Sequence, residues 1–147
     1  MPIQAISYTS RASPALGLDA VDQLARSAAA FNVQAGVTGL LLFDGSRFLQ
    51  YLEGPRDGMA VVFARVQNSR SHFDLAELGR GFPGRRFFPY WSMQLLPAEP
   101  SDIHGVADAD WSRLVLRKSR DEGEPESGVE RLARLTVPHW VDRPLAP

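Results

Sequence analysis

The sequence predicts an α+β fold, because two helical segments alternate with five strand-like segments in the order β-α-β-β-α-β-β. The spacing of apolar residues changes several times between a period of two and a helical period along residues 2–96. A continuous apolar run followed by an Asp-Gly pair adds the signature of a β-hairpin. This order is that of a ferredoxin-like split β-α-β unit with one further strand. We therefore expect a five-stranded mixed sheet with both helices on one face.

The first strand and the first helix are predicted from alternation and capping. Residues 3–10 alternate as a strand does, which places Tyr8 and Ser10 on the same face. Asp19 is a favourable N-cap residue, and a helical stripe of apolar residues follows it. We expect this helix to end near Asn32, ahead of a glycine.

A hairpin is predicted to follow the first helix. The sequence VTGLLLF at residues 37–43 is a continuous apolar run, which is typical of a buried strand. Asp44 and Gly45 supply the turn signal. The sequence RFLQYLE at residues 47–53 then forms the return strand.

The second helix and two more strands complete the predicted domain. Pro55 at a first-turn position and Asp57 near the positive end of the helix dipole indicate where this helix begins. A weaker strand is predicted at residues 73–78, a glycine-rich turn at residues 79–84 and the fifth strand at residues 87–95.

The chain changes character after the fifth strand. Residues 1–96 are predicted to form the domain, and residues 97–147 an appendage that packs on it and acts as an output or oligomer region. Prolines are frequent in the appendage, so long regular elements are not expected there. Apolar spacing predicts short helices at residues 111–115 and 129–133, with an acidic loop at residues 121–127 between them.

Composition excludes several classes of function. The 147 residues fit one domain, and 44% hydrophobic with 22% charged residues is ordinary for a globular protein. A formal net charge of −1 argues against a strong non-specific nucleic-acid binder. The absence of cysteine excludes disulfides, thiolate nucleophiles and cysteine-ligated metals, and three scattered histidines do not suggest a metal site. No leader or apolar span is evident, so a cytoplasmic location is predicted.

Gln50 is a polar residue in an apolar strand pattern. It shares a predicted strand face with Phe48 and Leu52. Because an unsatisfied buried amide costs roughly 1–3 kcal/mol, we expect Gln50 to have a hydrogen-bond partner. Tyr8, on a strand that should be central, is the obvious candidate. Taken alone, the pair is explained by a satisfied hydrogen bond in the core.

Other polar and aromatic residues are predicted to face the space between the sheet and the helices. Asn32 continues the inner stripe of the first helix, where an asparagine is often a C-cap. Arg65 lies beside the apolar stripe of the second helix, where an arginine usually extends to solvent. Trp91 and Met93 share a face of the fifth predicted strand, a pattern more common in a core than at a cofactor. Together with the tyrosine–glutamine pair, these residues predict a lining for a flat heteroaromatic guest with carbonyl and imide edges.

Over residues 2–96 the chain resembles the BLUF family, the flavin-based sensors of blue light. The matching motifs are Ser7-Tyr8-Thr9-Ser10, Phe31-Asn32, VTGLLLFDGSRFLQYLEGP at residues 37–55, Arg65, Arg85-Arg86-Phe87 and Trp91-Ser92-Met93. The long block with its tyrosine and Trp-Ser-Met motif at suitable distances is far more specific than a short pattern.

The resemblance implies a flavin site. FAD is the expected cofactor, with FMN or riboflavin as alternatives, and its isoalloxazine should lie between the two helices. Tyr8 and Gln50 match the light-active pair of the family. Asn32 matches the asparagine that binds the C4/N3 edge of the flavin, and Arg65 matches a basic residue near the other carbonyl edge.

The resemblance also assigns further residues to the switch, and it shows two places where the chain departs from the family's pattern. Trp91, Ser92 and Met93 match the strand residues that adjust near the glutamine during signalling, and Met93 is an expected cofactor contact. Phe31 is a further expected contact, although the family commonly has a polar residue there. Asn68, also an expected contact, begins a stretch that departs from the usual acid-x-Arg-His pattern.

The implied function is a blue-light photoreceptor without enzymatic turnover. Light should drive an electron and then a proton from Tyr8 to the flavin and leave Gln50 rotated or tautomerised. The signal should pass to a homo-oligomer or to a separate effector protein. The resemblance makes a cyclic-dinucleotide enzyme or a transcriptional regulator plausible as that effector. No membrane and no direct nucleic-acid partner is expected.

Other functions fit the fold. One alternative is a light-inert flavin-binding or protein-interaction module. An acylphosphatase would need a glycine-rich phosphate loop after the first strand, and residues 10–14 contain Arg11 but no glycine. A small flavin reductase is a further enzymatic alternative. An RNA-binding domain would need exposed aromatic residues in a basic setting, and Tyr51 beside Glu53 is a weak candidate.

Overall fold

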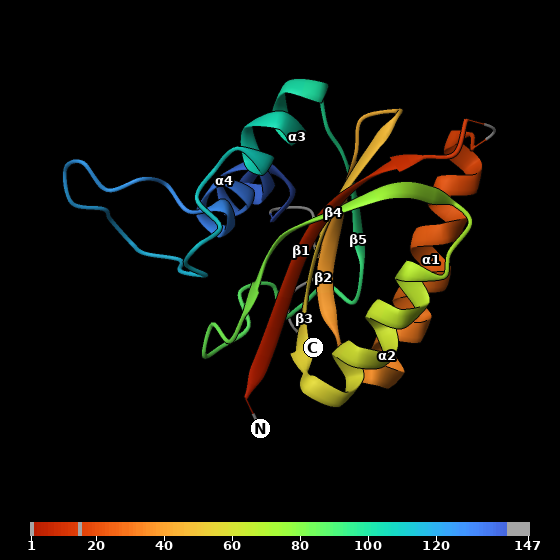
Figure 1. Cartoon of the computed structure of the whole chain (residues 1–147), viewed down its shortest axis with the longest axis horizontal. Coiled ribbons are helices and arrows are strands. Elements are labelled where there is room, and N and C mark those ends of the chain that lie inside the picture. The colour runs from red at the N-terminus through yellow and green to blue at the C-terminus, as the bar shows by residue number, and fades with distance from the viewer. Residues whose placement is uncertain (1, 15, 141–147) are drawn as a thin grey trace.

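The computed structural model describes residues 2–14 and 16–140. That part of the chain contains, in order, β1 (Ile3–Ala12), α1 (Leu18–Ala35), β2 (Thr38–Phe43), β3 (Arg47–Pro55), α2 (Arg56–Gln67), β4 (His72–Gly81), β5 (Gln94–Pro97), α3 (Pro100–Ala107) and α4 (Gly128–Trp140) (Figure 1). The strands form one sheet in the order β4-β1-β3-β2-β5, in which β2 and β5 are parallel and the other neighbours are antiparallel. The predicted α+β class and mixed five-stranded sheet are confirmed.

The sheet lies between two pairs of helices, with α1 and α2 on one face and α3 and α4 on the other (Figure 1). Side chains alternate along the central strand β3. Phe48 and Leu52 pack on the α1/α2 face, whereas Leu49 and Tyr51 pack on the α3/α4 face. Each face therefore has its own apolar core, and β3 contributes to both.

The helix boundaries differ slightly from those predicted. The N-cap of α1 is Gly17, so Asp19 lies within the first turn, where its charge complements the helix dipole. Pro55 is the N-cap of α2. The first helix continues past Asn32 and ends at Gly36, which adopts the left-handed conformation with φ of 73°. Asn32 is therefore not a C-cap, and its side chain is available for another role.

The fifth strand is not where the sequence predicted it. Instead of residues 87–95, only the four residues of β5 pair with β2, and the segment that precedes them is irregular. Pro89 lacks the N–H that a ladder requires. The N–H groups of Phe87 and Phe88 donate to the carboxylate of Glu53 and not to a neighbouring strand.

The glycine-rich stretch at residues 79–84 is not all turn. Its first residues, through Gly81, belong to β4 and pair with β1. A Cβ on Gly79 would lie 2.9 Å from the carbonyl oxygen of Trp111, and one on Gly81 would lie 3.3 Å from the side chain of Leu114. These glycines therefore allow the segment after α3 to pack closely on the strand.

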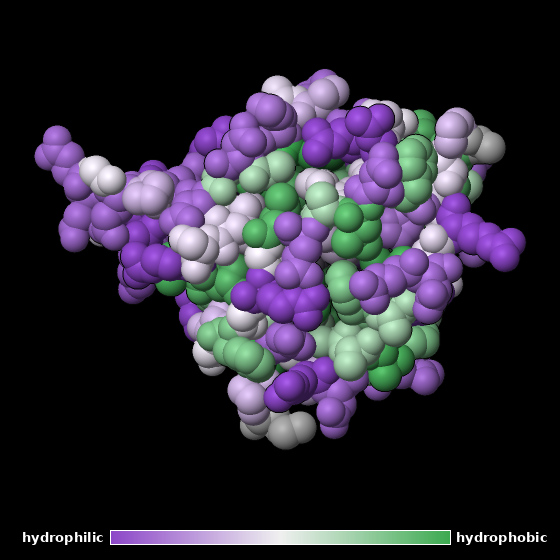
Figure 2. All heavy atoms as spheres, viewed as in Figure 1, coloured by the Kyte–Doolittle hydropathy of each residue, from purple (hydrophilic) through white to green (hydrophobic). Residues whose placement is uncertain are grey.

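The appendage also differs from its prediction. Residues 111–115 are irregular, not helical, and the indole N–H of Trp111 donates to the carbonyl of Val106 at 2.9 Å. Residues 129–133 are helical, as predicted, within α4. The acidic segment 121–127 belongs to a loop that projects from the molecule on the left in Figure 1 and is mostly hydrophilic in Figure 2.

The helix α3 was not predicted from the sequence. It begins with a capping box between Glu99 and Asp102, and Pro100 occupies its first turn. Ile103 and Val106 are fully buried on the α3/α4 face. Among the described helices, none is long and apolar enough to cross a membrane.

Candidate functional site

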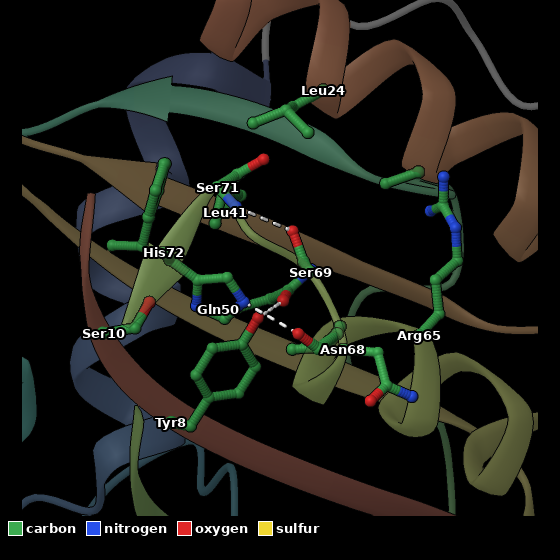
Figure 3. Close-up of a pocket in the computed structure, with 13 residues that line it drawn as sticks. Tyr8, Ser10, Leu24, Leu41, Gln50, Arg65, Asn68, Ser69, Ser71 and His72 are labelled. Carbon is green, nitrogen blue, oxygen red and sulfur yellow. Dashed lines mark hydrogen bonds between the residues drawn. The ribbon is translucent and has the colours of Figure 1, made fainter. Parts of the chain in front are cut away.

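A cavity of about 400 Å³ lies between the sheet and the pair α1 and α2 (Figure 3). This volume lies within the range of roughly 300–1,000 Å³ that is usual for sites of small organic ligands. Its walls are largely apolar, and polar side chains converge on it from three strands, one helix and the segment after α2. The lining residues are Tyr8, Ser10, Leu24, Ala28, Leu41, Phe48, Gln50, Arg65, Val66, Asn68, Ser69, Ser71 and His72.

Tyr8 and Gln50 meet in the wall of this cavity. They are direct neighbours in the register of β1 and β3, and the Tyr8 hydroxyl donates to Oε1 of Gln50 (Figure 3). The other end of the amide, Nε2, donates to Sδ of Met93 at 3.3 Å. The predicted hydrogen bond between the two side chains is confirmed. The amide of Gln50 therefore links the tyrosine to the segment that precedes β5.

Burial determines the protonation state of the tyrosine. Tyr8 is only 3% exposed, and burial raises the pKa of its hydroxyl well above the usual range. The phenol is therefore neutral in the resting protein and acts as a hydrogen-bond donor. Its ring contacts Phe63 edge-on, with centroids 6.0 Å apart. The donor is thus held in one orientation toward the amide oxygen.

The predicted residues from the two helices lie at different places relative to the cavity. Asn32 is buried, does not line the cavity, and donates from Nδ2 to the carbonyl of Ser92 at 2.8 Å. Arg65 lines the cavity; it donates to the hydroxyl of Ser27, and its guanidinium lies 4.8 Å from the ring centroid of Phe31. Asn68, the C-cap of α2, also lines the cavity. Phe31 itself is half-buried beside the site.

The structure separates Trp91 from Met93. Met93 packs in the core of the α1/α2 face, next to Gln50. Trp91 packs in the core of the α3/α4 face, where its ring stacks on Phe88 with centroids 6.1 Å apart. The prediction that the two residues share one strand face is wrong, because the segment is irregular here and does not alternate as a strand does. Ser92 lies between them and contributes its carbonyl to Asn32.

Four polar lining residues were not predicted to belong to the site. Alternation placed Ser10 on the strand face of Tyr8, but Ser10 was not predicted to contact a ligand. Its hydroxyl is buried and, among the described residues, is the one buried side-chain oxygen or nitrogen without a hydrogen-bond partner. Ser69, Ser71 and His72 follow α2, where no periodic pattern places a side chain. Nε2 of His72 lies 2.8 Å from the carbonyl of Val66.

This arrangement fits a planar ligand with polar edges. Apolar side chains such as Leu24 and Phe48 provide surfaces for a ring system. The partnerless hydroxyl of Ser10 and the polar groups of Arg65 and Asn68 can bind carbonyl or N–H groups along its rim. No cluster of three or more potential metal ligands occurs in the described part of the chain. The hydroxyl, amide and guanidinium groups that line the cavity suit an organic ligand.

Comparison with known families gives a match at the level of the whole domain. The family model described as "Sensors of blue-light using FAD" (BLUF) matches residues 3–94. This span includes the entire sheet but for the last residues of β5, both helices of the cavity and every residue that lines it.

Individual proteins also match parts of the chain. The "Blue light- and temperature-regulated antirepressor BluF" of Escherichia coli K12 is 40% identical over 57 residues, which is 38% of this chain and 14% of that protein. The "Photoactivated adenylate cyclase subunit beta-like protein FB" of Euglena gracilis is 28% identical over 95 residues, which is 64% of this chain and 11% of that protein. The chain thus spans a small part of the length of these relatives. The dark-state structure of the BLUF protein BlrB superposes with a TM-score of 0.63 at 28% identity, over 65% of this chain and 73% of that one.

Proposed function

The chain belongs to the BLUF family of blue-light sensors that use FAD, and we propose that it is a photoreceptor whose switch is the pair Tyr8 and Gln50. The observation that carries this proposal is the chain of contacts from the Tyr8 hydroxyl through the Gln50 amide to the sulfur of Met93. It lies in the wall of a cavity of suitable size and lining. A core hydrogen bond without function would not need to border such a cavity.

The cavity residues would hold a flavin, and FAD is the proposed cofactor. The apolar walls suit the isoalloxazine, and Arg65, Asn68 and Ser10 offer hydrogen bonds to its edges. Asn32 lies one helical turn after the lining residue Ala28 and does not line the cavity, and we propose that its carboxamide contributes a further contact to the flavin. FMN and riboflavin carry the same ring system and remain alternatives. A bound flavin would supply absorption of blue light and, once excited, a strong electron acceptor.

Tyr8 serves as the donor of an electron and a proton in this proposal. Its raised pKa prevents loss of the proton in the dark. When an electron leaves the ring, the phenol becomes a strong acid, and the existing hydrogen bond provides a path for the proton to Oε1 of Gln50. When the electron and proton return to Tyr8, the tyrosine is restored and only the arrangement of Gln50 has changed.

Gln50 suits this role because its amide carries an acceptor at one end and donors at the other. Rotation or tautomerisation exchanges these ends. The present donor bond of Gln50 is to the thioether of Met93, a weak acceptor, so little is lost when the amide turns. Two arrangements of similar energy are what a light-driven switch requires. A leucine could not switch, and a glutamate would carry a charge.

The output is proposed to pass through the chain's surface to another molecule, without turnover of a substrate. Two relatives are described as an antirepressor and as a protein that is like the beta subunit of a photoactivated adenylate cyclase. By analogy, this chain signals to a separate effector or within a homo-oligomer. Residues 1–96 are the proposed sensor domain, and residues 97–147 are the proposed output or oligomer region.

An absorption spectrum in the dark and under blue light tests the proposal. The purified protein should contain oxidised flavin, whose visible band moves slightly to the red in light and returns in darkness. Tyr8→Phe should bind flavin but lose this reversible shift, because the ring no longer carries the hydroxyl. Tyr90→Phe, which changes an exposed tyrosine, is the matched control and should keep the shift.

Other outcomes distinguish the alternatives. A protein that binds flavin and bleaches in light would indicate flavin redox chemistry without the hydrogen-bond switch. A protein that cannot be reconstituted with flavin would contradict the sensor and favour a light-inert interaction module. A normal shift in Tyr8→Phe would remove Tyr8 as the donor while leaving light sensing intact.

A further inference from the structure

The segment from Arg86 to Met93 connects the two cores of the molecule. It has no strand or helix of its own, and it carries Trp91 on the α3/α4 face and Met93 on the α1/α2 face. Each residue of its second half is held by a single hydrogen bond. The N–H of Gly39 donates to the Trp91 carbonyl at 2.7 Å, and Nδ2 of Asn32 donates to the Ser92 carbonyl at 2.8 Å. Nε2 of Gln50 donates to Sδ of Met93 at 3.3 Å. Such a segment can shift if one of these bonds changes.

Its first half is held by the carboxylate of Glu53. This residue lies on β3, three positions after Gln50, and is completely buried. One carboxylate oxygen accepts the N–H of Phe87 at 2.8 Å, and the other accepts the N–H of Phe88 at 2.6 Å. Two charge-assisted hydrogen bonds to consecutive amides fix both the position and the direction of the backbone there.

Four hydrogen-bond donors surround the carboxyl group of Glu53. Burial raises the pKa of this group above its usual range, and the two backbone amides and the hydroxyls of Tyr51 and Thr38 donate to it and reduce that rise. The hydroxyl of Thr38 also accepts from the guanidinium of Arg86 at 2.9 Å. A carboxylate can accept at all four positions, whereas a protonated acid could not. The charge is therefore part of the attachment.

We propose that Glu53 is a positioning residue for signal output, which fixes the start of this segment to the strand that carries Gln50. Because β3 holds both residues, a change at Gln50 moves Met93 relative to a fixed point. The segment between them must then turn, and Trp91 changes its packing on Phe88 in the α3/α4 core. Without the anchor, the segment would shift as a whole and the change would not reach Trp91. This inference rests on the proposed role of Gln50 as the switch.

Glu53→Gln tests the inference in the flavin-loaded protein. The variant has nearly the same shape, but its amide has one oxygen to accept and an NH₂ that faces a backbone donor. The red shift of the flavin should persist, because Tyr8 and Gln50 are unchanged. In darkness, amide hydrogen exchange at Phe87 and Phe88 should accelerate about tenfold or more. The light-minus-dark change of the Trp91 indole N–H signal in NMR should fall by about threefold or more.

Controls make these readouts specific. Trp91→Phe assigns the indole signal among those of the three tryptophans. Glu122→Gln removes one carboxylate from the exposed loop and should change neither the exchange rates nor the Trp91 response. Tyr51→Phe removes one hydroxyl donor to Glu53 and keeps the aromatic ring, so it should reduce the Trp91 response in the same direction by a smaller factor. This second variant decides the question if Glu53→Gln does not fold.

The outcomes separate failure of the inference from failure of the proposed function. A normal red shift with an undiminished Trp91 response in Glu53→Gln, or in Tyr51→Phe if only that variant folds, would overturn the role of Glu53 alone. Loss of the red shift in Glu53→Gln would also overturn it, because Glu53 would then act on the switch itself. Absence of a red shift in the unmodified protein would contradict the proposed function and the inference together.

Discussion

The two faces of the sheet are packed in different ways. The α1/α2 face encloses a cavity of about 400 Å³, and the hydroxyl of Ser10 beside it has no partner among the described residues. The α3/α4 face contains a series of aromatic contacts, in which Trp91 stacks on Phe88, Phe88 meets Tyr51 at 5.5 Å and Tyr51 meets Trp111 at 6.5 Å between centroids. A second cavity, of about 310 Å³, lies at the edge of this core beside Phe88 and Trp91. The cavity of the α1/α2 face borders a buried hydroxyl without a partner among the described residues, whereas the α3/α4 core is built on contacts between aromatic rings.

The two sides of the sheet also differ in the charge of the groups that form their hydrogen bonds. On the α3/α4 side, Glu130 accepts hydrogen bonds from the guanidinium of Arg117 at 2.7 and 2.9 Å and completes a capping box with Ser127 at the start of α4. The switch on the other side consists of neutral groups that can exchange donors and acceptors. Side chains alternate between the two faces along β3, so Gln50 lines the cavity and its neighbour Tyr51 packs in the α3/α4 core. Substitutions on the α3/α4 side should therefore alter stability and leave the red shift of the flavin in place, whereas substitutions in the Tyr8–Gln50 pair should alter the red shift itself.

The largest effect on stability is expected from Gly128→Ala. A Cβ at this position would lie 1.9 Å from the indole ring of Trp111, so the ring would have to leave its place. Overpacking of this kind should lower the free energy of unfolding by about 3 kcal/mol, measured by urea denaturation. Gly17→Ala, which adds a Cβ in open space, should cost about 1 kcal/mol or less. The light response of folded Gly128→Ala should persist, and its loss would break the division between the faces.

Glu130→Gln should have the next largest effect, and that effect should depend on pH. Hydrogen bonds from the Arg117 side chain, followed by backbone amides, lower the pKa of Glu130 to about 2 from an ordinary value of 4.5. Because the folded pKa is the lower one, ionised Glu130 stabilises the fold above pH 4.5, and this contribution is lost as the pH falls from 4.5 toward 2. Partial exposure of Arg117 screens the pair, so we expect the variant to be about 1–2 kcal/mol less stable at pH 7.

The measurement for Glu130 is urea denaturation of both proteins between pH 7 and pH 2. The difference between them should shrink across the lower part of this range. A difference that does not change with pH would show that the ionised carboxylate is not what stabilises the start of α4. Glu122→Gln, in the exposed loop, should show no difference at any pH.

Gln50→Leu should affect the light response more than the stability of the fold. The light-induced red shift should disappear completely, because leucine offers neither the acceptor for Tyr8 nor the donor to Met93. The free energy of unfolding should fall by about 1–2 kcal/mol, less than in Gly128→Ala, because the buried Tyr8 hydroxyl loses its acceptor and the apolar leucine side chain offsets part of that cost. Absorption spectra and urea denaturation of the same samples measure both quantities. A normal photocycle would remove Gln50 as the switch.

The sequence predicted the α1/α2 face better than the α3/α4 face, for physical reasons. Alternation along β1 and β3 placed Tyr8 and Gln50 on the inner faces of their strands, because the side-chain period is a local property, and the structure adds the register that makes them direct neighbours. The fifth strand was misplaced because its hydrogen-bond donors are satisfied by Glu53, a residue distant in sequence. No local pattern reveals such a contact, so the face on which Trp91 lies could not be predicted.

The starts of the two helices in the appendage could have been predicted from capping motifs in the sequence. The Ser127-x-x-Glu130 spacing is a capping-box signature and marks the start of α4 directly after the predicted loop, in agreement with the helix predicted at residues 129–133. Glu99 followed by Pro100 and Asp102 marks the start of α3 in the same way. By contrast, the place of Trp111 depends on the absence of a side chain at Gly128, which is a tertiary relation that sequence periodicity does not carry.

The smallest effect on the free energy of unfolding is expected for Ser10→Ala. Whether this variant is more or less stable shows if the hydroxyl belongs to the ligand site or to the packed strand. In flavin-free protein the buried hydroxyl has no partner, so its removal should be neutral or should stabilise the fold by up to about 1 kcal/mol. In the flavin complex, loss of a hydrogen bond to the cofactor should weaken flavin affinity by about two- to fivefold. Ser7→Ala, on the opposite face of the same strand, removes a donor to the Gln50 carbonyl and should destabilise both forms equally. If Ser10→Ala instead destabilised the flavin-free protein as Ser7→Ala does, Ser10 would belong to the packed structure of the strand and not to the ligand site, and the division between the two faces would fail at this residue.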